Sequence, residues 1–382
     1  MAILWHALVA GLAALAGRAM ASPTSSAPAP FASPSSSTSP STSPLKACNN
    51  SPTLCERAYN WVTFMGAHDS AFLRDASTGH SLAGNQYQNA TASLDGGIRL
   101  LQAQVHKQEG QLRLCHTLCN LLDAGSLQDW LAAIHAWMEQ NPREVVTLLL
   151  VNSDSASAAD FDAVFRSSGI SKLGYMPPAL GAGDWTTLGD MVDRGTRLVS
   201  FVTNIEPLST APYLVPEFDR VFETPFTVTD IAGFNCTVDR PARLAGGGGT
   251  AAVHKGMLGL VNHFKDITIS ESIAVPDTDT LGVVNSDDAA ETGALGTHLA
   301  QCAREWGGRR PSFALVDFWD VGRTVQVADA MNGISDASGR KAPAGGSAAD
   351  GSKVSMGAGI NGDVGRNVKG AMVVFLAMVL ML

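Results

Sequence analysis

The sequence predicts a single α/β domain of the (β/α) barrel type between residues 46 and 335. Short, unbroken apolar runs recur through this region, and such runs are typical of strands that are buried on both faces of a parallel sheet. Helical patterns lie between several of the runs, as they do in βαβ units. A barrel of about 250 residues has a normal size, so a second domain is not required.

The polar residues of one expected strand point toward a binding site. The expected strands cover residues 61–65, 98–105, 111–115, 145–151, 197–202, 257–261 and 313–316. In the second of them, apolar and polar residues alternate from Leu101 onward, so the two kinds face opposite ways. The polar set is Gln102, Gln104 and His106. A polar stripe inside a barrel is costly unless it serves a site, and we expect this one to line the substrate pocket.

The clearest helix covers residues 127–140. Its apolar residues recur on one face, Ser126 stands at the expected N-cap and Pro142 follows its end. A second helical pattern covers residues 294–306, ahead of the last expected strand. Alternating helices and strands support the barrel.

Both ends of the chain lie outside the predicted barrel. Residues 1–21 are apolar and end in small residues, as a secretory signal peptide does. Residues 22–45 are almost entirely Ser, Thr, Pro and Ala, which predicts an extended stalk. Residues 336–361 predict a flexible linker, and residues 362–382 end in an apolar tail typical of a glycosylphosphatidylinositol (GPI) attachment signal. We expect attachment at Asn361 and display on the extracellular face of the plasma membrane or the cell wall.

The covalent features agree with a secreted protein. An even number of cysteines favours disulfides over a metal site. Spacing alone does not fix their pairing, although short separations favour Cys48 with Cys55 and Cys115 with Cys119, which leaves Cys236 for Cys302. N-glycosylation sequons begin at Asn49, Asn89 and Asn235.

The formal net charge of -9, without a basic stripe, argues against a nucleic-acid partner. We expect a monomer without a cofactor.

Polar residues follow the ends of successive expected strands: His68 and Asp69, His106, His116, Asn152, Asn204, His263 and Asp317. In barrels, active sites are built at the C-terminal ends of the strands. Among these residues His68 and His116 form the most informative pair. Two imidazoles can take one proton and give another near neutral pH, as internal attack on a phosphodiester requires.

Seven segments carry a resemblance to a known family. They are FMGAHDSAF at 64–72, LDGGIRLLQAQVH at 94–106, LCHTLC at 114–119, NPREVVTLLL at 141–150, RGTRLVSFV at 194–202, LVNHF at 260–264 and RPSFALVDFWDVG at 310–322. In this order they resemble the X domain of phosphatidylinositol-specific phospholipase C, most closely its fungal secreted branch of phospholipase C-like phosphodiesterases. The resemblance implies a distorted TIM barrel and a phosphoric diester hydrolase that acts on a phospholipid or glycolipid headgroup.

The resemblance also implies roles for four residues. His68 would take the proton of the attacking hydroxyl and His116 would protonate the leaving oxygen. Asp317 would support His68, and Asp69 would support His116. The residues expected to bind the substrate are Gln102, Gln104, His106, Asn152 and His263.

The chain departs from the family pattern at Gln102 and Gln104. Bacterial members have Asp-x-Arg there, with the arginine on the phosphate, and animal members place acidic calcium ligands at these positions. Because both residues are neutral here, we expect no metal. His106, Lys107 or Arg113 would have to supply the missing positive charge.

This departure leaves two other functions open. The first is a barrel that has lost catalysis and binds a polyol or cell-wall glycan. The second is a glycoside hydrolase that uses Asp69 and Asp317, whose carboxyl groups would then have to lie about 5 to 9.5 Å apart. That function would leave the two histidines without a role.

Overall fold

A computed structural model describes residues 46–270 and 273–343. The expected signal peptide (1–21), stalk (22–45), attachment residue Asn361 and GPI signal (362–382) lie outside the described residues, as does the linker from residue 344 onward. No helix within the described ranges is long and apolar enough to cross a membrane.

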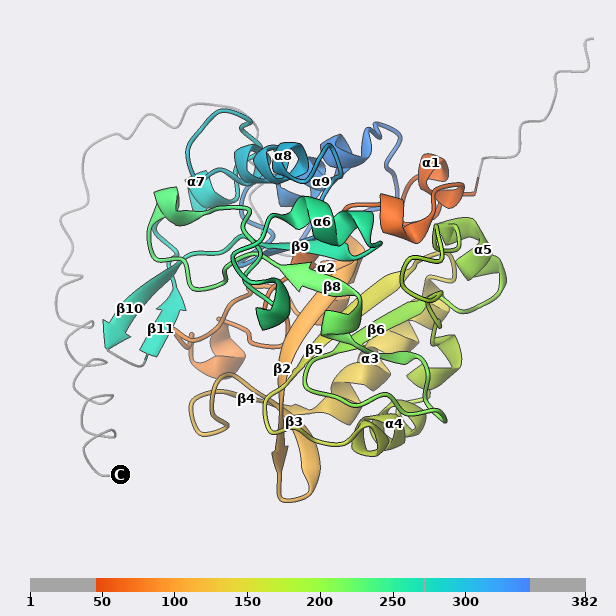
Figure 1. The fold of residues 1–382 in the computed structure, drawn as a ribbon. Helices are drawn as coiled ribbons and strands as arrows, with labels where there is room; N and C mark the ends of the chain where they lie inside the picture. Colours follow the sequence, from red (N-terminus) through yellow and green to blue (C-terminus); the bar gives the residue numbers. More distant parts are fainter. Residues whose placement is uncertain (1–45, 271–272, 344–382) are drawn as a thin grey trace, which may run out of the picture. The chain divides into compact units, whose positions relative to one another are not determined.

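The core of the fold is a curved sheet of eight parallel strands (Figure 1). Their order is β7 (Leu214–Pro216), β6 (Leu198–Val202), β5 (Val146–Asn152), β2 (Leu100–Gln108), β1 (Phe64–Ala67), β12 (Phe313–Val316), β9 (Leu258–Asn262) and β8 (Val221–Glu223). Within the described chain no ladder joins β7 to β8, so the barrel is open between them. The predicted α/β class and distorted barrel are confirmed.

One predicted strand has a different place. Residues 111–115 form β3 (Gln111–Cys115), which pairs antiparallel with β2 and with β4 (Asp123–Ser126) rather than entering the parallel sheet. The physical reason is the turn at Glu109 and Gly110, both at positive φ, because so short a connection can join only antiparallel strands. β3 therefore extends β2 beyond the barrel and carries His116 back to its rim.

The helices cover the outer face of the sheet. The predicted helix at 127–140 is α3 (Leu127–Gln140), and Asp129 N donates to the Ser126 side chain at its N-cap. The pattern at 294–306 is α8 (Leu295–Glu305). The other helices are α1 (Pro52–Cys55), α2 (Ala90–Gly96), α4 (Ala158–Ser167), α5 (Leu188–Asp193), α6 (Gly249–His254), α7 (Leu281–Val284) and α9 (Thr324–Asn332). A separate hairpin, β10 (Asp266–Ser270) with β11 (Ile273–Pro276), follows β9.

The predicted alternation in β2 sorts its residues between two apolar clusters. Leu100 packs with Phe64 and Phe313 inside the barrel. Leu101, Ala103 and Val105 belong to the outer cluster, together with the apolar face of α3. The inner layer above Leu100 is thus left to the glutamines, as the sequence predicted.

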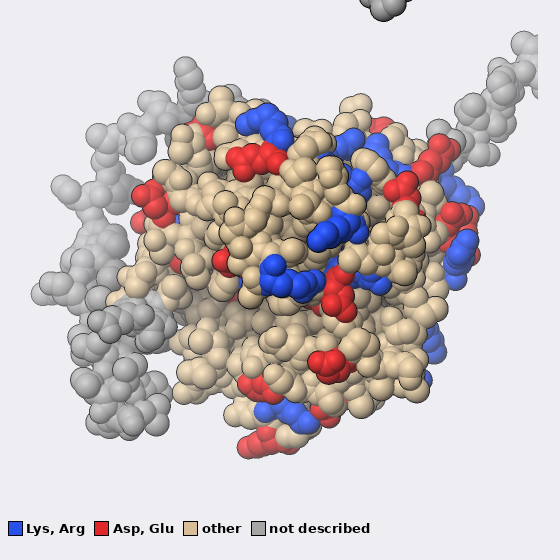
Figure 2. All heavy atoms as spheres, in the orientation of Figure 1, with Lys and Arg blue, Asp and Glu red and all other residues tan. Residues whose placement is uncertain are grey.

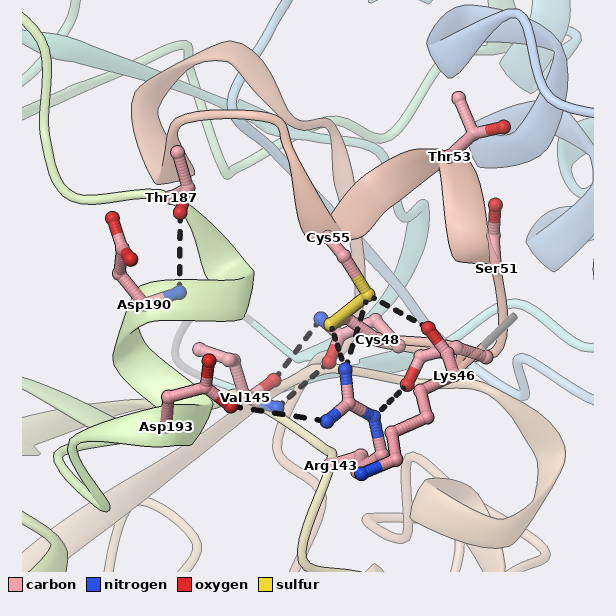
Figure 3. Close-up of a disulfide and its surroundings, with 12 residues drawn as sticks. Lys46, Cys48, Ser51, Thr53, Cys55, Arg143, Val145, Thr187, Asp190 and Asp193 are labelled. Carbon is pink, nitrogen blue, oxygen red and sulfur yellow. Dashed lines mark hydrogen bonds and ion pairs between the residues drawn. A yellow bond between two sulfur atoms is a disulfide. The ribbon is translucent and has the colours of Figure 1, made fainter. Parts of the chain in front are cut away.

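Three disulfides join the cysteines in the pairings that the spacing favoured: Cys48–Cys55, Cys115–Cys119 and Cys236–Cys302. The first closes the N-terminal end of the domain, where Arg143 Nη2 lies 3.2 Å from Cys48 Sγ and Arg143 Nε donates to the Ala47 carbonyl (Figure 3). This contact ties the start of the domain to the segment before β5.

The sequons differ in their accessibility. Asn89 is exposed at the N-cap of α2 and Asn235 is partly exposed. Asn49 is buried, and its amide exchanges hydrogen bonds of 3.2 and 2.7 Å with the backbone of Val145. Because Asn49 is only 6% exposed, a glycan on its Nδ2 would have to displace the packing around it, so the predicted glycosylation there conflicts with the fold.

The first residues of the expected linker lie against the domain. Asp336 accepts hydrogen bonds from the hydroxyls of Ser51 and Thr53. Arg340 pairs with Asp329 at 2.6 Å. The packed part of the domain therefore extends past residue 335.

Acidic and basic side chains are interspersed on the face seen in Figure 2, which carries no continuous basic stripe.

Candidate active site

Two histidines and two aspartates meet at the C-terminal rim of the sheet. His68 and Asp69 follow β1, Asp317 follows β12, and His116 follows β3. Asp69 Oδ2 lies 3.7 Å from His68 Nε2 and 3.5 Å from His116 Nε2. The two rings therefore face the same carboxylate oxygen from two sides.

His68 is held by a carboxylate and by an aromatic ring. Its Nδ1 lies 2.8 Å from Asp317 Oδ1, and its ring stacks on Phe264, with centroids 3.6 Å apart and planes 6° apart. Burial disfavours the charged ring, but the carboxylates of Asp69, Asp317 and Asp266 outweigh it and raise the pKa of His68 to about 9. At neutral pH, His68 is therefore the protonated ring.

His116 has the opposite tendency. It lies in the short loop that the Cys115–Cys119 disulfide closes, and its ring meets the edge of Phe72 at 5.2 Å. Burial lowers its pKa below the ordinary value, and the nearby Asp69 does not compensate fully. His116 is therefore the neutral ring of the pair.

The two glutamines hold Asp69 and the His116 loop. Gln102 Oε1 accepts a hydrogen bond of 2.6 Å from the backbone nitrogen of Asp69. Gln104 Nε2 donates to Asp69 Oδ2 at 2.7 Å, and its Oε1 accepts from Thr117 N at 3.0 Å. Asp69 has φ of +45°, an uncommon backbone conformation that these contacts hold in place. The glutamines thus build the site, as expected, but mainly by contacts within the protein.

Two residues expected in the pocket lie in the core instead. Asn152 is buried and bonds Ala156 and the carbonyl of Asn204, so it shapes the loop after β5. His263 is fully buried, with Nδ1 2.9 Å from His298 and Nε2 2.8 Å from the Val284 carbonyl. Burial, reinforced by His298, lowers the pKa of His263 well below its usual value. Both are satisfied structural residues.

The basic side chains that could replace the family's arginine are engaged elsewhere. Lys107 pairs with Asp160 at 2.9 Å and Arg113 with Asp123 at 2.7 Å. His106 lies 3.3 Å from Asp154, although its buried Nε2 has no partner among the described residues. Because Lys107 and Arg113 are paired elsewhere, protonated His68 is the positive charge that lies beside Asp69.

The site contains residues that sequence patterns did not single out. Asn85 donates to Asp317 Oδ1 at 3.0 Å, and Gln86 Nε2 donates to the His68 carbonyl at 2.7 Å. Asp266 begins β10, and burial together with Asp317 raises its pKa to about 6. These residues and Phe264 lie in loops or at a strand start, where no periodicity marks them.

The carboxylates of the site are turned to protein donors rather than toward a shared cation position: Asp317 Oδ1 lies at 2.8 Å from His68 Nδ1 and accepts from Asn85. Gln104 turns an amide N–H group toward Asp69. Among the described residues, the cluster of three possible metal donors is Cys236, His298 and Cys302, and its two cysteines form a disulfide.

Comparisons with known proteins assign the sequence to a family. The PI-PLC X family model (PI-PLC X 1) matches residues 54–332. The PI-PLC X domain-containing protein 1 of Arthroderma benhamiae is 37% identical over 290 residues, which cover 75% of this chain and 90% of that protein. An uncharacterized secreted protein of the same fungus is 33% identical over 330 residues, covering 84% of this chain and 69% of that protein.

Similarity also extends to solved structures. A phosphatidylinositol-specific phospholipase C mutant from Staphylococcus aureus aligns with a TM-score of 0.46 and 10% identity, over 72% of this chain and 94% of that one. The Listeria monocytogenes phosphatidylinositol-specific phospholipase C aligns with a TM-score of 0.45 and 13% identity, over 73% of this chain and 94% of that one. On the family-model match and the two fungal relatives, the chain belongs to the PI-PLC X domain family.

Proposed function

We propose that this protein is a phosphoric diester hydrolase that cleaves the headgroup of a phospholipid or glycolipid by acid-base catalysis with His68 and His116. The observation that carries the proposal is the position of Asp69 Oδ2, 3.7 Å from His68 Nε2 and 3.5 Å from His116 Nε2. General acid-base catalysis needs one group that takes a proton and another that gives one within reach of the same reacting centre.

In the proposed first step, a hydroxyl of the headgroup attacks the phosphorus and its proton passes to His68 Nε2. The bond between phosphorus and the lipid alcohol oxygen breaks, and His116 Nε2 protonates that oxygen. The products are a cyclic phosphodiester and a free lipid alcohol. Water then opens the cyclic ester with the two roles reversed, which restores both rings.

Without substrate, the shared proton lies on His68 and not on His116. The pKa of His68 is raised to about 9 and that of His116 is lowered, so His68 carries the proton at neutral pH whereas the first step needs it on His116. Since both Nε2 atoms face Asp69 Oδ2, we expect the proton to cross to His116 when the substrate binds. Before that transfer, protonated His68 supplies positive charge that attracts the incoming phosphate, a role that the neutral Gln102 and Gln104 cannot take.

The test is headgroup release from phosphatidylinositol vesicles, followed by phosphorus NMR, with and without a chelator. His68→Ala and His116→Ala are each expected to lower turnover by about 10² to 10⁴, and the chelator is expected to change nothing. His80→Ala is the control, because His80 is exposed in the same loop as Asn85. Turnover at the wild-type rate in a His68→Ala, His116→Ala double variant would overturn the proposal.

A second function, binding of a polyol or glycan without catalysis, is favoured by one observation: Lys107 and Arg113 pair with acidic residues outside the site. Calorimetry with inositol phosphates and glycans distinguishes it. Heat of binding without any product in the phosphorus spectrum would favour this function over hydrolysis.

We further propose secretion and a GPI anchor. Three disulfides and a secreted fungal relative support secretion. The apolar tail and small residues near Asn361 motivate the anchor. If Asn361 is the attachment residue, an Asn361→Lys variant should appear in the medium or stay inside the cell, whereas the wild type should label at the surface. Surface labelling of the variant at the wild-type level would contradict the assignment.

A further inference from the structure

The loop between β1 and α2 places a buried amide beside the His68–Asp317 pair. Asn85 is 1% exposed. Its Nδ2 donates to Asp317 Oδ1 at 3.0 Å and lies 3.3 Å from His68 Nδ1. Asn85 is far from Asp317 in sequence, so the contact depends on the folded loop.

Two backbone hydrogen bonds fix the position of Asn85 in this loop. Asn85 N donates to the Phe72 carbonyl at 2.9 Å, and the Asn85 carbonyl accepts from Phe318 N at 2.8 Å. The neighbouring Gln86 Nε2 donates to the carbonyls of His68 and Val316. The loop is thus tied to the ends of β1 and β12, the strands that carry the two catalytic partners.

The hydrogen bond between Asn85 and Asp317 bears on which ring nitrogen of His68 carries a proton in the neutral state. Asp317 Oδ1 receives both the Asn85 amide and His68 Nδ1, while Asp317 Oδ2 is buried without a partner in the described chain. Rotation of the carboxylate would break both bonds. With Oδ1 held, Nδ1 must carry a proton to meet it at 2.8 Å, and Nε2 is left as the nitrogen that exchanges its proton at the site.

We propose that Asn85 is a positioning residue that fixes the orientation of Asp317 and, through it, the Nδ1–H tautomer of His68. The effect on rate rests on the proposed function, whereas the effect on the His68 ring does not. The two can therefore be measured separately.

The experiment uses NMR of the full chain with labelled histidine, and reads the titration and the neutral tautomer of His68. Asn85→Asp is expected to keep the wild-type tautomer, because a buried carboxyl group 3.0 Å from Asp317 Oδ1 retains its proton and can still donate to that oxygen. Asn85→Ala is expected to give a mixture of Nδ1–H and Nε2–H forms above the pH at which His68 titrates. If the wild type hydrolyses phosphatidylinositol, Asn85→Ala should also lower kcat about tenfold or more with little change in KM.

Asn285→Ala is the matched control. Asn285 is equally buried, and its Nδ2 donates to the backbone carbonyls of Asp317 and Phe318 rather than to the carboxylate. It should destabilise the protein without changing the His68 titration or tautomer. A His68 ring that keeps the Nδ1–H form in Asn85→Ala as fully as in the wild type would overturn the inference, whether or not the wild type is active.

Discussion

The imidazole of His68 stacks face to face on the phenyl ring of Phe264, with centroids 3.6 Å apart. Phe264 follows β9 and precedes the β10–β11 hairpin, so this contact links the proposed base, which follows β1, to a strand on the far side of β12. It also shields one face of the ring from water, which strengthens the electrostatic interactions of His68 with its carboxylates.

We expect Phe264→Ala to lower kcat/KM about tenfold to a hundredfold, because the ring gains freedom and small misplacements at a reacting centre are costly. The same change should lower the free energy of unfolding by about 3 to 5 kcal/mol. Phe264→Tyr keeps the stacked ring and serves as the control. Equal losses of rate in both variants would show that stacking is not the cause.

The pH dependence of kcat/KM should follow the single proton that the two rings share. This proton is lost as the pH rises through the pKa of His68, about 9, so activity should fall above that pH. It should also fall below the lowered pKa of His116, where both rings are protonated. Rates of headgroup release across this range test the assignment. A rate that already halves between pH 7 and pH 8 would be incompatible with it.

Stability should follow the same titration of His68. A raised pKa in the folded state stabilises the protein fully below the unfolded pKa, near 6.5, and this contribution is lost as the pH rises through about 9. The loss is at most about 3 kcal/mol. Urea unfolding at pH 7 and pH 10 measures it, and His68→Gln should remove most of the difference. An unchanged difference in His68→Gln would assign it to other groups.

The Cys115–Cys119 disulfide should matter more for activity than for stability. It closes a loop with a sequence separation of 4 around His116, and so short a loop contributes only about 2 kcal/mol. A Cys115→Ser, Cys119→Ser variant should remain folded but lose most of its turnover. The Cys236–Cys302 pair, with a separation of 66, is the contrasting case. Its removal should cost about 4 kcal/mol and leave the rate of the folded fraction unchanged.

In the described ranges, most exposed large apolar residues lie in the segments that follow β1, β3, β8 and β9: Leu82, Tyr87, Leu118, Phe226, Ile267 and Ile269. Ile267 and Ile269 are 46% and 47% exposed on β10, in the hairpin that projects from the body in Figure 1. Ile269 lies at an irregularity of the β10–β11 pairing, between Thr268 and Ser270, so what the two side chains share is their exposure on this hairpin.

If the substrate lies in a bilayer, Ile267→Thr with Ile269→Thr should weaken vesicle binding about tenfold or more, since each side chain loses roughly 1 kcal/mol of burial in lipid. Hydrolysis of a soluble, short-chain substrate should not change. Met176→Thr is the control, because Met176 is 62% exposed beside the start of β6, away from the rim. Equal vesicle binding by the rim variant and the control would exclude this role for the hairpin.

The sequence predicts the barrel well because its strands follow one physical rule. Strands buried on both faces give unbroken apolar runs, and β5 and β12 appear where those runs lie. The short strands β7 and β8 were missed, since three residues are too few to form a pattern.

The candidate site is predicted less completely. The position of a polar residue at a strand end suggests a site residue. It does not show whether the side chain already forms hydrogen bonds within the protein, as the side chains of Asn152 and His263 do. Asn85 and Phe264 belong to the site, but no sequence pattern identifies them. Each reaches the site through a tertiary contact with a residue distant in the chain, and local sequence carries no sign of that contact.

The open seam between β7 and β8 has a consequence for solubility. An edge strand exposes unpaired backbone N–H and C=O groups, with which strands of other chains can pair and aggregate. Very short edge strands and proline limit this pairing. β7 and β8 have three residues each, and Pro216 ends β7. We therefore expect the protein to resist self-association at the high local concentration that the proposed display on a cell surface would impose.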